Sequence, residues 1–423
     1  MGANFNLKTL TVALAALSAA SIASAAGLDR SGQDITAFLQ DGTYAETVYT
    51  YLDADVSGHD NAYVGPDKNA YQQGKKIDDI AESYDFFRYG VKADINDTFS
   101  VGILYDEPFG AAADYSGNNN FVDQNPLSPR NGEGTNVEVR TENITGILGA
   151  KLGENKNFQI YGGPVAQRVK ANVKLRGTAY EVANGYTTNI NADQDYGWIA
   201  GVAYSKPEIA LQAALTYRSE IEHNANAFES YPLAPRVGGS IPPVAGGPFV
   251  FPSTRDGDIE ITTPKSVNFD FQTGINPTML ATAKVRWVPW SDFAIVPSLY
   301  NEVSTANPAY RPDGLSLVSY DKDQWLVELG LAKRLTPALA VTGNIGWDSG
   351  AGNPVSSLGP IDGYYSAGLG AKYNFTENWA ISAGGKYLWF GDAEGQIPSK
   401  TVVSNFEDND GFALGMKLSY QAK

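Results

Sequence analysis

Apolar and polar residues alternate with a period of two along much of the chain, most clearly over 362–391. Between Trp379 and Phe390, mainly aromatic and aliphatic side chains fall on one face, whereas the other carries Ser, Gly and Lys among apolar residues. The segment before Asn374 alternates in the same way, and a short polar link from Asn374 to Asn378 joins the two. This arrangement predicts an antiparallel β-hairpin.

The same pattern recurs and predicts fourteen strands. We expect them near 44–57, 83–94, 98–106, 136–152, 158–175, 195–205, 209–223, 258–275, 279–303, 322–334, 339–347, 362–374, 379–391 and 410–420. Short links alternate with long ones, and the long links include 107–135, 176–194, 224–257, 304–321 and 392–409. Pro289 could divide the segment 279–303, which we keep whole because division would give an odd number of strands.

An even number of strands joined by alternating short and long links is typical of an outer-membrane barrel. A soluble half-buried sheet also alternates, so the prediction depends on many such strands in series. The last strand, 410–420, alternates up to Tyr420 and resembles the signal read by the barrel assembly machinery. We therefore predict an all-β fold, a transmembrane antiparallel β-barrel over residues 44–423 in a Gram-negative outer membrane.

The N-terminus has the features of a secretory signal peptide over residues 1–25. Lys8 precedes an apolar stretch from Leu10 to Ala20, and Ala23-Ser24-Ala25 is a small-residue cleavage site. Removal of this segment would leave 26–43 ahead of the first strand. We expect that segment to form a short N-terminal plug, or hatch.

The composition agrees with a barrel and excludes several classes of protein. After the signal peptide there is no apolar run of roughly 18 residues, so no transmembrane helix is expected. The mean hydropathy is −0.25, which suits a barrel because only alternate residues face lipid. A net charge of −16 argues against nucleic acid as a partner.

Catalytic and metal chemistry has little support in the sequence. The chain has two histidines, His59 and His223, and no cysteine, too few for a zinc site. No Gly-x-Ser-x-Gly element accompanies His223 in a suitable context. We expect no enzyme activity, no catalytic residue and no cofactor. The Asp- and Asn-rich stretch from Asp114 to Asp123 is either a solvated loop or a calcium site.

Several short motifs resemble the outer-membrane family that transports long-chain fatty acids and aromatic hydrocarbons. Leu215-Thr216-Tyr217-Arg218-Ser219-Glu220 is the most specific, and Tyr196-Gly197-Trp198 and Trp290-Ser291-Asp292-Phe293 are similar to other family segments. The start at Ala26-Gly27-Leu28 also resembles the family. The Asn-Pro-Ala element of the family hatch is absent between Ala26 and Ala45.

The resemblance implies a plugged barrel that takes up hydrophobic molecules by passive diffusion and releases them sideways into the membrane. Family members are expected to be monomers, with hydrophobic small molecules and outer-membrane lipid as partners. A kink in the third strand would form the lateral opening; Gly110 occupies the matching position, and Pro108, Phe109 and Gly110 are the candidate residues. An ordinary strand end followed by a turn is the alternative for these three residues.

Candidate ligand-binding residues lie in three regions. The outer loop 224–257 is rich in apolar residues, among them Leu233, Phe249 and Phe251, and forms either an exposed capture surface or a lid that packs inward. In the predicted plug, Phe38 lines a pocket or anchors the plug.

The third region is a basic column. Arg168, Lys170 and Lys174 share one face of their strand, and the other face is apolar. If the apolar face meets lipid, the basic face lines the lumen and binds a carboxylate headgroup. Lys174 matches a basic family position. Alternatively the column pairs with Glu220 and Glu222, on the expected face of Arg218, which is itself a candidate.

Two function classes follow. The first is a channel for hydrophobic molecules, favoured by the apolar loop, the plug and the family motif. The second is a non-specific porin for small polar solutes, which would have an open, water-filled lumen and no plug.

Overall fold

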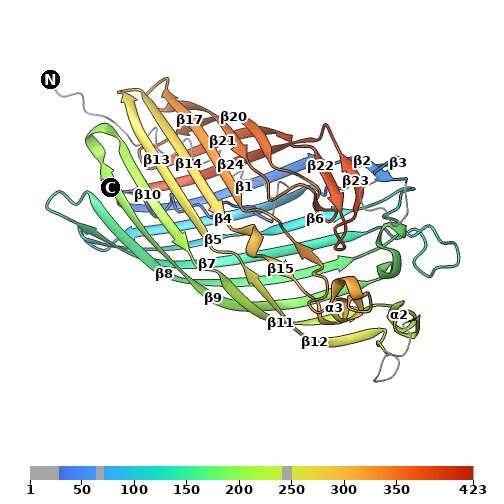
Figure 1. Cartoon of the computed structure of the whole chain (residues 1–423). Helices are drawn as coiled ribbons and strands as arrows, with labels where there is room; N and C mark the ends of the chain where they lie inside the picture. The colour runs from blue at the N-terminus through green and yellow to red at the C-terminus, as the bar shows by residue number, and fades with distance from the viewer. Residues whose placement is uncertain (1–27, 63–70, 241–249, 423) are drawn as a thin grey trace.

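The computed structural model describes residues 28–62, 71–240 and 250–422. A single large antiparallel sheet closes on itself as a barrel, because β1 pairs with β24 on one side and with β4 on the other. The sheet contains 17 strand segments. Three strands are each interrupted once, giving the pairs β5 and β6, β10 and β11, and β12 and β13, so the barrel has fourteen strands (Figure 1).

The barrel strands follow the chain order. They are β1 (Thr43–Asp55), β4 (Tyr84–Asp94), β5 (Phe99–Asp106), β6 (Gly110–Asp114), β7 (Asn136–Leu152), β8 (Phe158–Lys174), β9 (Thr187–Lys206), β10 (Leu211–Arg218), β11 (Ile221–Ser230), β12 (Thr254–Thr263), β13 (Ser266–Asn276), β14 (Met279–Val288), β17 (Gln324–Arg334), β18 (Leu339–Asp348), β20 (Tyr364–Asn374), β21 (Trp379–Phe390) and β24 (Asp410–Ala422).

Short turns join the strands at one end of the barrel, and longer segments with their own structure lie at the other (Figure 1). A second, five-stranded sheet caps part of the long-loop end and consists of β2 (Gly58–Asn61), β3 (Gln73–Ile77), β19 (Val355–Ser356), β22 (Ala393–Gln396) and β23 (Val402–Phe406). The same end carries η2 (Thr178–Ala183), α2 (Ala234–Ser240), α3 (Ser298–Ser304), η5 (Pro308–Tyr310) and the pair β15 (Ala294–Ile295) and β16 (Val318–Ser319). We call the part of the barrel next to the short turns the inner half, and the part next to the long segments the outer half.

The predicted fourteen-stranded barrel is confirmed, with corrections to individual strands. The segment 279–303 is not one strand: β14 ends at Val288, and η4 (Trp290–Asp292) and α3 follow. Pro289 has no N–H to donate to a ladder and Pro297 precedes α3, so continued pairing is unfavourable here. The loops 176–194 and 224–257 are shorter than expected because β9 begins at Thr187 and β11 extends to Ser230.

The inner half is apolar outside, and its interior holds many buried polar side chains beside an apolar cluster around Phe38. Exposed aliphatic side chains cover its outer surface, among them Ile103, Leu148, Ile160, Val202, Leu369 and Leu414. Charged and polar side chains are buried in its interior, among them Glu46, Arg88, Lys92, Asn344, Lys372 and Lys417. A surface of this kind is stable only in contact with lipid, so the inner half is the membrane-spanning part. Among the described residues, no helix is long and apolar enough to cross a membrane.

The interior of the outer half is instead a large apolar core. Val139, Val173, Ile259, Trp290 and Phe406 belong to one buried cluster that joins the strands to the long segments. Burial of this core fixes the long segments inside and above the strands, as in a soluble protein.

Candidate functional site

The N-terminal segment 28–42 crosses the interior of the barrel. It contacts β5 through Ser31, whose hydroxyl donates to Asp106 at 2.7 Å, and β13 through Gln33, whose side chain accepts from Ser266 at 2.6 Å. Because β5 and β13 are separated by several strands around the barrel, the segment spans the lumen.

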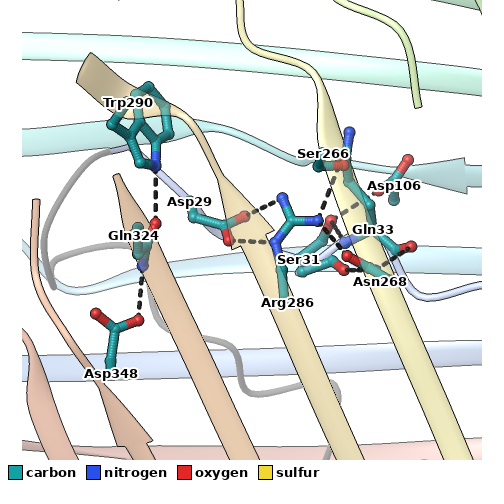
Figure 2. A network of polar contacts seen from close by, with 11 residues as sticks. Asp29, Ser31, Gln33, Asp106, Ser266, Asn268, Arg286, Trp290, Gln324 and Asp348 are labelled. Atoms are coloured by element: carbon teal, nitrogen blue, oxygen red, sulfur yellow. Dashed lines mark hydrogen bonds and ion pairs between the residues drawn. The ribbon is translucent and has the colours of Figure 1, made fainter. Parts of the chain in front are cut away.

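A buried ion pair anchors the beginning of this segment. Arg286 of β14 donates from Nε and Nη2 to the two carboxylate oxygens of Asp29 at 2.6 and 3.0 Å (Figure 2). Its Nη1 donates to Gln33 and Asn268 at 3.1 and 2.8 Å. Bidentate charge-assisted contacts of this kind are strong and directional, so this end of the segment is firmly held. Figure 2 shows a second polar chain, in which the Trp290 indole donates to Gln324.

The far end of the segment is held by a second set of contacts in the inner half. Arg88 of β4 donates to Asp34 at 3.0 Å and lies 3.5 Å from Glu46 of β1. The Phe38 ring packs on Tyr161 of β8 with 5.7 Å between centroids. Some polar side chains of the inner lumen therefore hold the N-terminal segment, whereas others, such as Lys284 Nζ and both side-chain amide atoms of Asn344, are buried without a hydrogen-bond partner among the described residues.

A break in the third strand lies directly beside the start of this segment. Three residues, 107–109, stand opposite residues 141–142 of β7, because the register passes from Asp106–Asn143 to Gly110–Arg140. The extra residue bends the chain inward as a β-bulge does. Pro108 carries no N–H, and its carbonyl accepts from the backbone N–H of Arg30 at 2.6 Å. The Gly110 N–H donates to the Leu28 carbonyl at 2.7 Å.

The break interrupts the wall of the barrel. The β4–β5 ladder ends at the pair Tyr89–Tyr105, and pairing beside β6 resumes only at the bridge between Ala81 and Ala113. Within the described chain, the stretch of β4 from Tyr84 to Arg88 therefore pairs with β1 but has no ladder partner on the side of the break. The strand is thus broken at the residues of the predicted kink, and their role in a lateral opening stays a prediction.

Two small apolar cavities lie next to the break. The larger measures about 50 Å³, and its lining includes Leu28, Ile80, Ala112, Val139, Ile295 and Leu358. The smaller measures about 10 Å³ and lies between Phe109 and Trp290, whose rings meet edge to face at 5.5 Å. Leu28, Val139 and Ile295 line both cavities, so the two are neighbours.

A third cavity, of about 570 Å³, lies among the long segments at the outer end. Its lining includes Tyr180, Tyr231, Val237, Tyr300, Leu315 and Ile397. Burial raises the pKa of Tyr180 to about 12 and also raises the pKa values of Tyr231 and Tyr300. These three phenols stay neutral at physiological pH, so they add no charge to the cavity wall.

The structure contradicts the predicted position of the basic column. Arg168 and Lys170 are exposed on the outside of β8, Lys174 lies on the same face, and none lines the lumen. Val165 and Val169, expected to meet lipid, are instead buried in the interior. The reason is that Val165 packs in the apolar cluster around Phe38, and that β8 then enters the outer half, where Ala171 and Val173 belong to the large apolar core.

The expected grouping of Arg218 with Glu220 and Glu222 is also wrong. Arg218 points into the barrel and donates to the Thr145 hydroxyl at 3.3 Å. The strand is interrupted at residues 219–220, after which Ile221 faces inward and Glu222 faces outward. The interruption changes which side chains share the inner face.

The apolar loop residues pack mainly inward. Phe251 is buried in the large core, Leu233 packs against it, and only Val250 is strongly exposed among these described neighbours. Phe249 lies outside the described residues. Phe38 is fully buried in a separate cluster of the inner half and lines none of the three cavities, so its contacts are those of an anchor.

Sequence reasoning did not single out Arg30, Arg286 or the alanines of β6. Arg286 lies in a strand and resembles any other lumen charge, and only its distance to Asp29 reveals its role. The run Ala111-Ala112-Ala113 directly after the kink was the available signal for the cavity beside the break.

The described residues contain no group of three or more His, Asp or Glu side chains that could hold a metal ion. His223 is buried, with its ring nitrogens 3.0 Å from Gln167 and 3.3 Å from Asp193. Its surroundings are those of a structural hydrogen-bond network.

Comparison with known proteins identifies the fold and the family. A Pseudomonas aeruginosa FadL homologue matches with a TM-score of 0.66 at 14% identity, over 90% of each chain. The Pseudomonas putida toluene transporter TodX matches at 0.59 and 13%, over 91% of each chain. The Ralstonia pickettii toluene transporter TbuX matches at 0.55 and 12%, over 92% of each chain.

No curated protein matches the sequence. The family of outer membrane transport proteins that includes OMPP1, FadL and TodX matches residues 34–421, nearly the whole described chain. These proteins are transport channels of the outer membrane and not enzymes. The chain therefore belongs to the OMPP1/FadL/TodX family of outer membrane transport proteins.

Proposed function

We propose that this protein carries hydrophobic small molecules across the outer membrane by passive diffusion. The observation that carries the proposal is the division of the lumen: the three described cavities lie in the outer half, two of them lined mainly by apolar residues, and the inner half is crossed by a segment held by buried ion pairs. Fold relatives named as toluene transporters agree with a hydrophobic substrate.

The route we propose begins at the outer cavity near Tyr231 and Tyr300. The aromatic part of its lining favours transfer of apolar molecules from water, although polar residues such as Glu181 also line the cavity. The ligand then enters the cavities beside the break at residues 107–109 and leaves through the interrupted wall between β4 and β7. Lateral release avoids the inner lumen, whose buried charged and polar groups would disfavour an apolar molecule.

In this proposal residues 26–43 act as the plug and residues 44–423 as the barrel, after cleavage of a signal peptide at 1–25. Residues 1–27 lie outside the described chain. We further propose a monomer that is inserted by the barrel assembly machinery and surrounded by outer-membrane lipid.

Uptake by cells that lack their own transporter tests the proposal. Radiolabelled toluene and a radiolabelled long-chain fatty acid are supplied with and without this protein, and uptake of at least one should rise. The alternative, a porin for small polar solutes, is tested in liposomes that contain the purified protein. No uptake of either hydrophobic molecule, together with rapid sugar-driven swelling, would favour the porin.

A further inference from the structure

Basic side chains begin on the outer surface of the barrel where the exposed apolar side chains of the neighbouring strands end. Ile144 of β7, Ala166 of β8 and Tyr196 of β9 stand opposite one another in a single row, and Ile144 and Tyr196 are exposed. Toward the long-loop end, the next two outward-facing residues of β8 are Arg168 and Lys170, and both are exposed. A change from apolar to charged side chains on the outward face marks the edge of the hydrocarbon layer.

The heights of these bases place them among the lipid headgroups. A strand that rises 3.3 Å per residue and is tilted by about 40° gains about 5 Å along the membrane normal for every two residues. Arg168 and Lys170 therefore lie about 5 and 10 Å beyond the apolar row. The polar layer of a bilayer extends about 5–8 Å beyond the hydrocarbon core on each side. The long side chains of both residues can thus reach the headgroups from the boundary with water.

The same surface brings two like charges together. Lys170 stands directly opposite Arg140 of β7, an arrangement that destabilises a sheet when nothing compensates the repulsion. Arg140 pairs with Glu138 at 2.8 Å, and Arg168 lies 3.9 Å from Glu142. Lys170 forms no ion pair within the described chain. An anion held between Arg140 and Lys170 would replace their repulsion by two attractions.

The charge of the outward face differs from one side of the barrel to the other. On β11 and β12 the exposed charged side chains that face outward are acidic, namely Glu222, Asp256, Asp258 and Glu260. The whole chain has a net charge of −16, so a group of bases is not a general property of its surface. An anionic headgroup is therefore attracted to the surface of β7 and β8 and repelled from that of β11 and β12.

We propose that Arg140, Arg168 and Lys170, which we call the basic patch, bind the phosphate groups of a lipid in the outer leaflet. Each guanidinium can donate two parallel hydrogen bonds to a phosphate, and the lysine adds a compact positive charge. The acyl chains of the same lipid would lie along Ile144 and Leu148, which are exposed on the outward face of β7 below the patch. A lipid bound here surrounds the barrel and is not a transported molecule, so the inference does not depend on the proposed function.

The experiment is native mass spectrometry of the full-length protein released from nonionic detergent micelles. The probes are diphosphoryl lipid A, a phosphorylated glycolipid, and the same lipid after removal of both phosphates. The basic-patch variant combines Arg140→Gln, Arg168→Gln and Lys170→Gln. Heat-modifiable migration on SDS gels reports whether each variant is folded.

A control variant removes the same amount of charge from the long segments at the outer end. It combines Lys76→Gln, Lys322→Gln and Lys400→Gln, at three exposed positions outside the barrel strands. A general effect of net charge on lipid binding would appear equally in both variants, whereas a site on β7 and β8 is lost only in the first.

We expect the basic-patch variant to bind lipid A at least about tenfold more weakly than wild type, as the loss of several exposed charge contacts predicts. The control variant should change this affinity less than about twofold. The dephosphorylated lipid should bind wild type and both variants equally and weakly. Equal lipid A affinity in wild type and a folded basic-patch variant, equal losses in the two variants, or equal binding of both lipids to wild type would overturn the inference.

Discussion

The inner and outer halves of the barrel are built from the same strands, but the outward face is apolar in the inner half and polar in the outer half, and most buried charges lie inside the inner half. In the inner half, aliphatic side chains such as Leu148 face outward and polar side chains such as Lys417 face inward. In the outer half, Val173 is buried inside and Arg168 is exposed outside. The difference teaches that the surrounding medium, lipid or water, decides which face of a strand is apolar.

The reversal occurs within a single strand, β8. Phe158 and Ile160 near its inner end face outward and are exposed, as lipid contact requires. Lys170, on the same face, is also exposed but carries a charge. Between them the outward face passes from membrane to water, whereas the inward face, with Tyr161, Val165 and Val173, is buried along the strand.

The largest expected effect comes from the outer core. Trp290→Ala removes contacts with Phe109, Phe293 and Tyr320 and a hydrogen bond to Gln324. We expect the free energy of unfolding to fall by about 3–5 kcal/mol. Urea titration in lipid vesicles, followed by circular dichroism, measures it. Trp389→Ala, on the outward face of β21, should cost clearly less, and equal losses would contradict an apolar core in the outer half.

The next largest effect is expected for the ion pair that anchors the N-terminal segment. Arg286→Met leaves the Asp29 carboxylate buried without its cation, which destabilises the attachment by about 3 kcal/mol. The segment then leaves its place more often, and sugar-driven swelling of liposomes should become faster. The exposed Arg140→Gln variant should behave as wild type. Unchanged permeability in Arg286→Met would show that this ion pair does not close the lumen.

A charge on the lipid face should have a smaller effect. Leu148→Lys places an ammonium where an exposed aliphatic side chain faces outward in the inner half. The expected loss in the free energy of unfolding is about 2–4 kcal/mol at the membrane midplane. Folding yield into vesicles as a function of urea gives the value. A neutral result would move the lipid boundary away from Leu148.

The smallest effect is expected for the opposite change on the same side of the barrel. Lys170→Leu replaces an exposed charge in the outer half, where the surroundings are water, and should change stability by about 0.5 kcal/mol or less. Hydrophobic uptake should also stay unchanged, because Lys170 lines none of the three cavities. Loss of uptake would restore the lumen position that the sequence suggested.

Much of the fold could be predicted from the sequence because a period of two is a local property of each strand. The hairpin from Tyr364 to Phe390 is an example, since its alternation and its turn specify the pairing. Pro289 marks a point where a strand could divide, but an even number of strands required 279–303 to stay whole in the prediction. The number of barrel strands is still even, because the chain between β14 and β17 leaves the barrel and adds no strand to it.

The site was harder to predict because alternation shows which residues share a face and not which medium that face meets. The prediction that Arg168, Lys170 and Lys174 line the lumen assumes that the whole strand spans the membrane. An interruption such as residues 219–220 changes which side chains of the strand face the interior, and no regular sequence pattern predicts it. The contacts of the Arg30 side chain with Gly110 and Tyr84 could not be predicted, because these residues are distant in the chain.

The most direct test uses spin labels on single cysteines, since the chain contains no cysteine of its own. Labels at Ile160, Val169 and Lys170 of β8 are compared for relaxation by oxygen, which concentrates in lipid, and by a water-soluble nickel chelate. We predict that oxygen relaxes the label at Ile160 most, that the chelate relaxes the label at Lys170 most, and that Val169 is shielded from both. Strong oxygen relaxation at Val169 with shielding of Lys170 would contradict the reversal between the two halves.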